Sequence, residues 1–272
     1  MPPVENVADL NQPDLIFYDD FRSGRLDPSK WNVRTTGKVV NNEQQAYVDS
    51  SETIYIASTH ENTGVENKVL VLHPHYQPGF TTRDGQHFDF ISGRIDTREK
   101  FHFTYGSASA RMKLPAGAGL WPAFWAMGYG SWPENGEIDV MEYVGEPDWV
   151  SCALHGPGYF GESALVNKLF FWNGEDATSW HTYTVDWAPN RIVFKVDGVV
   201  VYRVTRPMVD FFGPWMFSNE KYLILNLALG GVYPFKTNGI RAPYFGIPED
   251  TVLKIREDQV RVLIDWVKVY EF

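Results

Sequence analysis

The sequence predicts an all-β fold, a sandwich in which two antiparallel sheets pack face to face. Short apolar runs rich in aromatic and β-branched residues recur along the chain, bounded by Gly, Pro, Asn or Asp. Two of these runs are joined only by Asp197-Gly198, which is the strongest short-range signal for a β-hairpin. The sequence contains no long segment of 3.6-residue periodicity and no internal repeat, which argues against a helical or solenoid fold.

The expected elements follow from these runs. Residues 1–14 are polar and contain prolines, so they are expected to form a loose lead-in. Residues 15–272 are expected to form one domain, a size that β sandwiches commonly reach as a single unit. A short helix is expected near Arg206 to Phe212. The expected strands cover residues 15–18, 69–72, 108–112, 182–185, 192–196, 199–202 and 222–225.

Composition limits the classes of partner. The formal net charge is -10, from 24 basic and 34 acidic side chains, which disfavours nucleic acid, anionic membranes and sulfated polymers. No apolar run approaches the roughly 18 to 20 residues of a membrane span. The chain holds 10 Trp, 14 Tyr and 18 Phe, which suit half-buried strands and also form flat faces on which sugar rings stack.

Cys152 is the only cysteine, so the chain cannot form an internal disulfide. Nothing beside it in the sequence indicates a lowered pKa, and a buried, unreactive thiol is expected. The first residues, Met1 to Glu5, lack the basic and apolar regions of a signal peptide. Two locations remain open: secreted or extracellular, with the signal peptide absent from this chain, or intracellular.

The segment from Glu137 to Glu142 says most about function, because it carries three carboxylates within six residues, interleaved with apolar side chains. Alternate residues of a strand share a face, so Glu137 and Asp139 point one way. Strict alternation would place Met141 beside them, and one extra residue, a β-bulge, is needed to bring Glu142 to the same face. Like charges held together favour a site whose ionisation states are set for chemistry over a solvated acidic face.

Glycoside hydrolysis uses two carboxyl groups, one to protonate the leaving oxygen and one to attack the anomeric carbon or activate water. Glu137 and Glu142 would lie roughly 13 Å apart at Cα, from steps of ~3.3 Å. Two side chains leaning together are compatible with the ~5 to 5.5 Å carboxyl separation of a retaining mechanism. Asp139 lies between them and is expected to share a proton with Glu137, keeping the pKa of Glu137 low while Glu142 stays protonated.

At these residues the sequence resembles glycoside hydrolase family 16, in its laminarinase-like branch. The catalytic signature of that branch, Glu-Ile-Asp-x-x-Glu, stands at residues 137–142, whereas the related lichenase branch lacks the extra residue. The resemblance covers nearly the whole chain. Other matching blocks are Asn41-Asn42-Glu43-Gln44, Ser92-Gly93-Arg94-Ile95, Gly119-Leu120-Trp121-Pro122-Ala123-Phe124-Trp125, Ala153-Leu154-His155-Gly156, Asn226-Leu227-Ala228-Leu229-Gly230-Gly231 and Ile264-Asp265-Trp266.

The resemblance implies a β-jelly roll whose concave sheet forms a long polysaccharide cleft. It implies that Glu137 is the nucleophile, Asp139 its assisting acid and Glu142 the general acid/base. Each expected cleft residue has a structural alternative: a core aromatic, a surface ion pair, a structural histidine or an asparagine bound to backbone. The expected substrate-binding residues are Asn42, Arg94, Trp121, Trp125, Trp132, His155, Asn226 and Tyr233.

The sequence also departs from the family's pattern. Gly231-Val232-Tyr233-Pro234 stands where many relatives have Gly-Asn-Trp-Pro, so Tyr233 replaces a tryptophan. This change leaves the acids intact and bears on which glucan is preferred.

No cofactor is expected for catalysis, but a structural calcium ion is a candidate. Asp265 shares a strand face with apolar residues, where an unpaired carboxylate is costly to bury. The resemblance implies that Asp265 joins Asp20 in holding calcium on the convex face. A hydrogen-bonded Asp265 without metal is the alternative.

The expected function is that of a retaining endo-β-glucanase acting on β-1,3 or mixed β-1,3/1,4 glucan such as laminarin, and the expected partner is this polysaccharide or its oligosaccharides. The chain is expected to be a monomer. An agarase-like galactan hydrolase and a transglycosylase on the same scaffold are the alternatives among enzymes. A non-catalytic β-glucan-binding protein is the alternative from another class; such relatives typically lose a catalytic glutamate, whereas this chain keeps all three acids.

Overall fold

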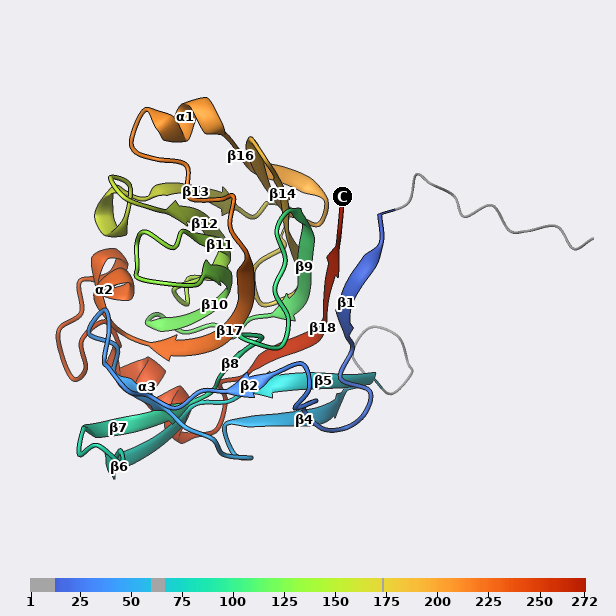
Figure 1. The fold of residues 1–272 in the computed structure, drawn as a ribbon. Coiled ribbons are helices and arrows are strands. Elements are labelled where there is room, and N and C mark those ends of the chain that lie inside the picture. Colours follow the sequence, from blue (N-terminus) through green and yellow to red (C-terminus); the bar gives the residue numbers. More distant parts are fainter. Residues whose placement is uncertain (1–12, 60–66, 173) are drawn as a thin grey trace, which may run out of the picture.

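Two large antiparallel sheets make up most of the structure, as the sequence predicts (Figure 1). The computed structural model describes residues 13–59, 67–172 and 174–272. The predicted lead-in, residues 1–14, lies outside the described residues except for its last two. No helix in the described ranges is long and apolar enough to cross a membrane.

The first large sheet has eight strands in the described part of the chain. β1 (Leu15–Asp19) pairs with β18 beside the main path of the sheet. The predicted hairpin is confirmed, because Asp197 and Gly198, both at positive φ, connect β15 to β16. The spatial order of the remaining strands is β16 (Val199–Thr205), β15 (Arg191–Val196), β14 (Trp180–Ala188), β9 (Gly106–Lys113), β18 (Val262–Tyr270), β5 (Asn67–Leu72) and β4 (Ile54–Thr59).

The second large sheet has seven strands in the same described ranges and carries the acidic segment. Its acidic strand, β11, has a neighbour on each side, so its position is set by two ladders. The spatial order is β13 (Leu165–Phe170), β12 (Trp149–His155), β11 (Glu137–Glu142), β10 (Leu120–Gly128), β17 (Lys221–Leu229), β8 (Arg94–Asp96) and β2 (Asn32–Val33).

A third, small sheet was not expected from the sequence. It contains β3 (Gln45–Tyr47), β7 (His87–Ser92) and β6 (His75–Thr81), and β3 runs parallel to β7. In Figure 1, β6 and β7 lie at the lower end of the molecule, below β2. The parallel pairing joins segments about forty residues apart, and no local pattern in the sequence indicates it.

Three short α-helices lie in connections within the described residues. α1 (Arg206–Asp210) stands where a helix was predicted. α2 (Val232–Asn238) and α3 (Glu249–Arg256) were not predicted, because helices of seven and eight residues give too little periodicity to recognise. α2 ends at Gly239, which takes the left-handed conformation that closes many helices. A single 3₁₀ turn (Gly161–Ser163) follows β12.

The core lies between the two large sheets and is supplied by both. β14 shows the expected alternation, with every second residue buried. β17 is buried along its whole length. Cys152 of β12 belongs to this core, so the prediction of a buried thiol is confirmed, and burial raises its pKa far above the ordinary value.

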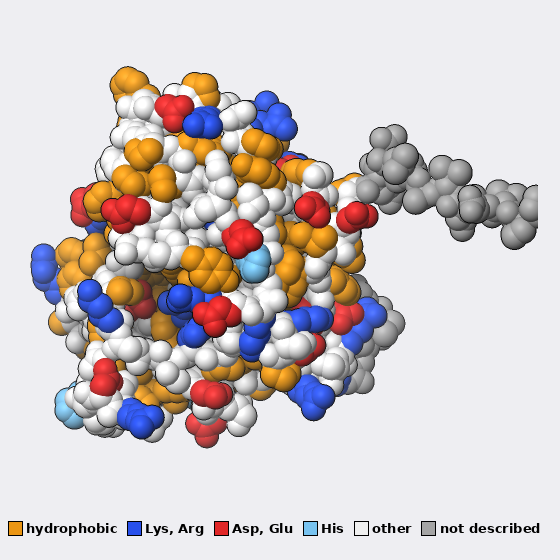
Figure 2. Space-filling model, in the orientation of Figure 1, with side chains coloured by type: hydrophobic (Ala, Val, Ile, Leu, Met, Phe, Trp, Pro, Cys, Tyr) orange, Lys and Arg blue, Asp and Glu red, His pale blue; other side chains and the backbone are white. Residues whose placement is uncertain are grey.

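Charged side chains of both signs are scattered over the face seen in Figure 1, around a hollow lined in part by hydrophobic side chains (Figure 2). The negative net charge is therefore not gathered into one acidic surface on this face.

Candidate active site

A β-bulge in β11 brings the three carboxylates to one face of the seven-stranded sheet. Asp139 pairs with Ala153 of β12 and Glu142 pairs with Ser151, so two residues of β11 stand opposite one residue of β12. The register toward β10 shifts at the same place. The bulge predicted from the sequence is present, and the added residue lets Glu142 interact electrostatically with Asp139 and Glu137.

The apolar side chains of β11 anchor the strand in the core between the two large sheets. Ile138, Val140 and Met141 are buried in the core shared by the two sheets. The carboxylates are therefore carried by a rigid, fully packed element, which is what a site of defined geometry requires.

His155 of β12 lies against the acidic cluster. Its Nε2 atom is 3.1 Å from Oδ2 of Asp139 and 4.0 Å from Oε1 of Glu137. The backbone N–H of Gly161 donates a hydrogen bond to Nδ1 of His155 over 3.1 Å. Because Nδ1 accepts this hydrogen bond, Nε2 is the ring nitrogen that faces the carboxylates.

Burial governs the ionisation of all three acids. Burial first, and then repulsion by Asp139, raise the pKa of Glu137 to about 8. Burial also raises the pKa of Glu142 to about 7. The pKa of Asp139 is raised well above its usual range, by burial first and then by the charge of Glu142. The three groups therefore hold protons near neutral pH, and an acid and a carboxylate can coexist there.

The structure corrects one expectation about Glu137. Asp139 was expected to keep the pKa of Glu137 low, but the hydrogen bond and the charge of Asp139 both raise it. The reason is that both carboxyls are buried side by side, so the pair retains a proton that each would lose in water. The expectation that Glu142 stays protonated agrees with its raised pKa.

A tryptophan lies beside each of the two glutamates. The indole N–H of Trp121 on β10 donates to Oε1 of Glu142 over 3.0 Å. The side chain of Trp132 lowers the pKa of Glu137, against the larger effect of burial. Trp132 is 45% exposed, so nearly half of its surface remains open for contact with a ligand.

Further aromatic residues stand around these tryptophans. Trp132 packs edge-on against Phe160, with ring centroids 5.3 Å apart, and lies 6.1 Å from the ring of His155. Trp121 packs edge-on against Tyr233 of α2, with centroids 5.6 Å apart. Tyr233, the residue that departs from the family's pattern, thus lies beside Glu142 through its contact with Trp121.

A chain of hydrogen bonds runs from β10 to the small sheet. Trp125 donates to Oδ1 of Asn226 over 2.7 Å, and the amide of Asn226 donates to the hydroxyl of Tyr47 over 3.1 Å. The hydroxyl of Tyr47 lies 3.5 Å from Oε2 of Glu43. Asn226 is thereby held by side chains, not by backbone groups as its structural alternative supposed.

A match to a family profile identifies the protein family that carries this site. The profile described as "Glycosyl hydrolases family 16" matches residues 34–224, a range that contains all three acids. The chain belongs to glycosyl hydrolase family 16.

Individual relatives agree with this membership. The chain is 33% identical over 233 residues to a β-glucanase from Rhodothermus marinus, covering 81% of this chain and 77% of that protein. It is 32% identical over 293 residues to glucan endo-1,3-β-glucosidase A1 from Niallia circulans, covering 96% of this chain but only 39% of that protein.

The fold is also that of a solved family member. The structure of an endo-β-1,3-glucanase from Pyrococcus furiosus superposes with a TM-score of 0.80 at 29% sequence identity, covering 95% of this chain and 94% of that one. The all-β jelly-roll architecture expected for family 16 is thus confirmed.

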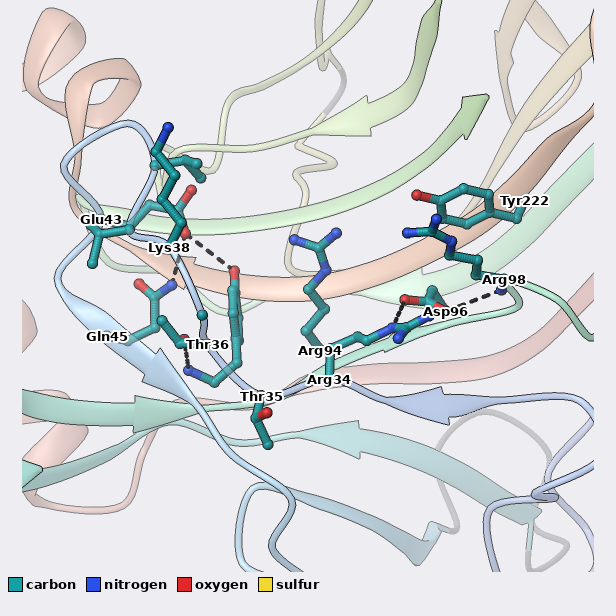
Figure 3. A pocket seen from close by; sticks show the side chains of 14 residues that line it. Arg34, Thr35, Thr36, Lys38, Glu43, Gln45, Arg94, Asp96, Arg98 and Tyr222 are labelled. Carbon is teal, nitrogen blue, oxygen red and sulfur yellow. Dashed lines mark hydrogen bonds and ion pairs between the residues drawn. The ribbon is translucent and has the colours of Figure 1, made fainter. Parts of the chain in front are cut away.

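In this family 16 chain, a hollow beyond Trp125 is built around Arg94 of β8. The Arg94 guanidinium lies 5.1 Å from the ring centroid of Trp125 and 6.0 Å from that of Tyr47. Figure 3 shows Arg94 standing between Glu43 on one side and Arg98 with Tyr222 on the other. The Nε atom of Arg94 is buried and has no hydrogen-bond partner among the residues described.

Other cations line the same hollow. Arg34 is paired with Asp96, whereas Lys38 and Arg98 complete a set of basic side chains around Arg94. The net charge of the chain therefore does not describe the local field here, because four cations face two acids.

Asn42 does not share this hollow. It lines a second hollow with Gln44, Gln86 and Tyr244, and its carbonyl accepts a hydrogen bond from Gln44 over 2.6 Å. Asn42 and Arg94, expected together at one end of the cleft, are thus placed in neighbouring hollows that share Glu43.

The two aspartates expected to hold calcium are paired with arginines. Oδ2 of Asp265 lies 2.6 Å from Nη1 of Arg111, and Asn67 donates to its other oxygen. Asp20 lies 3.2 Å from Nε of Arg22. The structure thus places Asp265 as the hydrogen-bonded alternative describes, because Arg111 and Asn67 together occupy both of its carboxylate oxygens. Calcium accordingly enters no step below.

Sequence reasoning did not single out Ser151, Tyr47 or Glu43 as site residues. The hydroxyl of Ser151 lies 2.9 Å from that of Tyr233 and so helps to fix the aromatic wall beside Glu142. Ser151 stands directly opposite Glu142 in the ladder, but that position is known only once the register of the bulge is known. Tyr47 belongs to β3 of the small sheet that the sequence did not predict, and Glu43 lies just before that strand.

Proposed function

We propose that this protein is a retaining endo-β-glucanase that hydrolyses β-1,3 or mixed β-1,3/1,4 links. The observation that supports this most is the arrangement on β11, where Glu137 and Glu142 flank Asp139 on one face and Trp121 donates a hydrogen bond to Glu142. One glutamate can act as an acid while the other acts as a nucleophile, which is the division of labour that glycoside hydrolysis needs.

In the first step Glu142 acts as the general acid. Its raised pKa of about 7 keeps it protonated below neutral pH. It gives its proton to the glycosidic oxygen as a carboxylate oxygen of Glu137 attacks the anomeric carbon. The bond from that carbon to the leaving oxygen breaks, the leaving sugar departs as an alcohol, and an ester joins the remaining sugar to Glu137.

In the second step the now ionised Glu142 acts as the general base. It takes a proton from a water molecule, whose oxygen attacks the anomeric carbon and displaces Glu137. Two displacements at one carbon retain its configuration, and both glutamates return to their starting states.

Asp139 and His155 prepare Glu137 for attack. The proton shared by Glu137 and Asp139 must lie on Asp139 when Glu137 attacks, and their hydrogen bond provides the path for it. Nε2 of His155 lies 3.1 Å from Oδ2 of Asp139 and faces this group from the neighbouring strand.

The surrounding aromatics support a polysaccharide as substrate. Exposed Trp132, together with Trp121, Trp125 and Tyr233, offers ring faces and edges for sugar units on both sides of the acids. Arg94, Asn226 and Asn42 offer polar groups toward one end. The glucanases among the relatives make β-glucan the polymer that we propose.

Product analysis on defined substrates tests this function. Laminarin and barley glucan should yield oligosaccharides by internal cleavage, and freshly released products should keep the β-anomer by NMR. Glu137→Gln should lose at least about 1,000-fold in kcat/KM. Glu134→Gln, an exposed neighbour, is the matched control and should stay active.

Three other outcomes contradict parts of the proposal. Unaltered glucan hydrolysis by Glu137→Gln would refute the role of Glu137. Cleavage of agarose in preference to glucan would point to a galactan hydrolase. Binding of glucan without turnover would indicate a recognition protein.

We also propose that the enzyme works outside the cytoplasm as a monomer without a catalytic cofactor. Glucan polymers are too large to cross a membrane, and the chemistry above uses only side chains of this chain. Light scattering and activity after chelation test the last two points.

A further inference from the structure

Two histidines and an aspartate converge away from the cleft. His73 follows β5, His75 begins β6, and Asp258 lies between α3 and β18. One ligand atom from each of these residues lies within 4.8 Å of the others. Their chain segments are distinct from β11, which carries the catalytic acids, and all three lie within the described ranges.

The second nitrogen of each imidazole is already engaged. Nε2 of His75 lies 3.0 Å from the carbonyl oxygen of Glu52. A carbonyl only accepts, so His75 carries its proton on Nε2 and keeps a free lone pair on Nδ1. Nδ1 of His73 lies 3.2 Å from the hydroxyl of Tyr55, which leaves Nε2 of His73 facing the cluster.

Asp258 is oriented in a similar way. Arg261 bonds to Oδ2 of Asp258 over 2.5 Å. The other oxygen, Oδ1, lies 2.7 Å from Nε2 of His73. In metal sites, neighbouring groups typically bond to the ligand atoms that face away from the metal. These bonds hold the remaining ligand atoms pointing toward one another.

The Nε2 atom of His73 has no hydrogen-bond partner among the described residues, despite this short distance to Asp258. The atom is also buried. His73 is only 4% exposed, so no bulk solvent surrounds this nitrogen. A buried imidazole nitrogen without a hydrogen-bond partner is available as a metal ligand.

We propose that His73, His75 and Asp258 bind a divalent transition-metal ion such as Zn²⁺. Nε2 of His73, Nδ1 of His75 and Oδ1 of Asp258 would be its ligands, with water completing the shell. Imidazole nitrogens with one carboxylate suit zinc and its neighbours, whereas calcium takes oxygen ligands.

The bound ion would cross-link distant segments of the chain. It would join the end of β5 and the start of β6 to the connection between α3 and β18, which are far apart in sequence. Binding to the folded state alone raises stability, so the ion should raise the melting temperature without changing the chemistry of the cleft.

Calorimetric titration of the chelator-treated full chain with ZnCl₂ tests the proposal. Wild type should bind one equivalent, and Asp258→Ala and His75→Ala should each weaken binding at least tenfold. His87→Ala is the matched control, because His87 is an exposed histidine of the same small sheet with one ring-nitrogen bond to Thr81. It should bind as wild type does.

A second cluster requires a separate control. Glu137, Asp139 and His155 also place ligand atoms within 4.8 Å of one another, so the titration is repeated with Glu137→Gln. Zinc binding should survive Glu137→Gln. The glucanase activity of His75→Ala, measured without metal, reports that this variant is folded.

A spectroscopic readout gives independent support. Co²⁺ added in place of Zn²⁺ should develop visible absorption in wild type and His87→Ala, but not in His75→Ala. No binding by wild type, equal binding by His75→Ala and Asp258→Ala, or loss of binding in Glu137→Gln would each overturn the proposal.

Discussion

Trp121 donates its indole N–H to Oε1 of Glu142 over 3.0 Å. This bond opposes the effect of burial, because a donor stabilises the ionised carboxylate and lowers the pKa that burial raises. The pKa of the proposed general acid is thus a balance between burial and Glu137, which raise it, and His155 and Trp121, which lower it.

Replacing Trp121 by Phe removes the donor and keeps an aromatic ring. The pKa of Glu142 should rise, so the basic limb of the kcat/KM profile should move to higher pH, since a general acid must be protonated. The rate at the optimum should fall roughly tenfold through lost positioning. A pH profile on laminarin checks this, and an unmoved basic limb would contradict the role of Glu142.

Asp139→Asn should remove the effect of Asp139 on the pKa of Glu137. The charge and hydrogen bond of Asp139 both raise the pKa of Glu137, so the pKa should fall in the variant. The acidic limb of the profile should move to lower pH, because Glu137 must be ionised to attack. The rate should drop about 100-fold as the proton acceptor is lost. An acidic limb that stays in place would show that Asp139 acts only in packing.

Glu137→Gln should be more stable than wild type at high pH. A carboxyl whose pKa is raised on folding, here from 4.5 to about 8, loses stability as pH rises between these values. The variant cannot ionise, so its advantage should grow from pH 5 to pH 8 by roughly 1 to 3 kcal/mol. Urea unfolding at both pH values measures this difference. A constant offset between the two proteins would disprove the linkage, and Glu134→Gln should show no pH-dependent change.

Arg94→Met should impair binding more than chemistry. The guanidinium faces the hollow beyond Trp125, away from the carboxylates of β11. KM for long glucans should rise about tenfold with kcat within about threefold of wild type. Steady-state kinetics on laminarin decide this, and an equal loss of kcat would place Arg94 in the chemical step.

Asp265 should stabilise the fold through Arg111 without calcium. EGTA, which removes calcium selectively, should leave the melting temperature unchanged. Asp265→Asn should lower the free energy of unfolding by roughly 1 to 3 kcal/mol, because Arg111 loses a partner 2.6 Å away. A melting temperature that falls with EGTA and recovers with added calcium would restore the metal to this face.

Much of the fold and the centre of the site were predictable because their signals are local. The hairpin at Asp197-Gly198 and the bulge that returns Glu142 to the acidic face follow from alternation and turn chemistry within a few residues. Trp121 and Trp125 were predicted as cleft residues, but their individual bonds to Glu142 and Asn226 were not.

The sequence by itself determined the position of the acidic strand, the β architecture of the protein and the family to which it belongs. Each of these depends on residues close together in the chain or on the order of short sequence blocks. Tertiary structure decided which way Asp139 moves the pKa of Glu137, since that depends on how deeply the pair is buried. It also placed Tyr233 beside Trp121 and brought Asp258 to His73, contacts between segments far apart in sequence. Such contacts depend on the register and packing of whole sheets, and no short stretch of sequence encodes them.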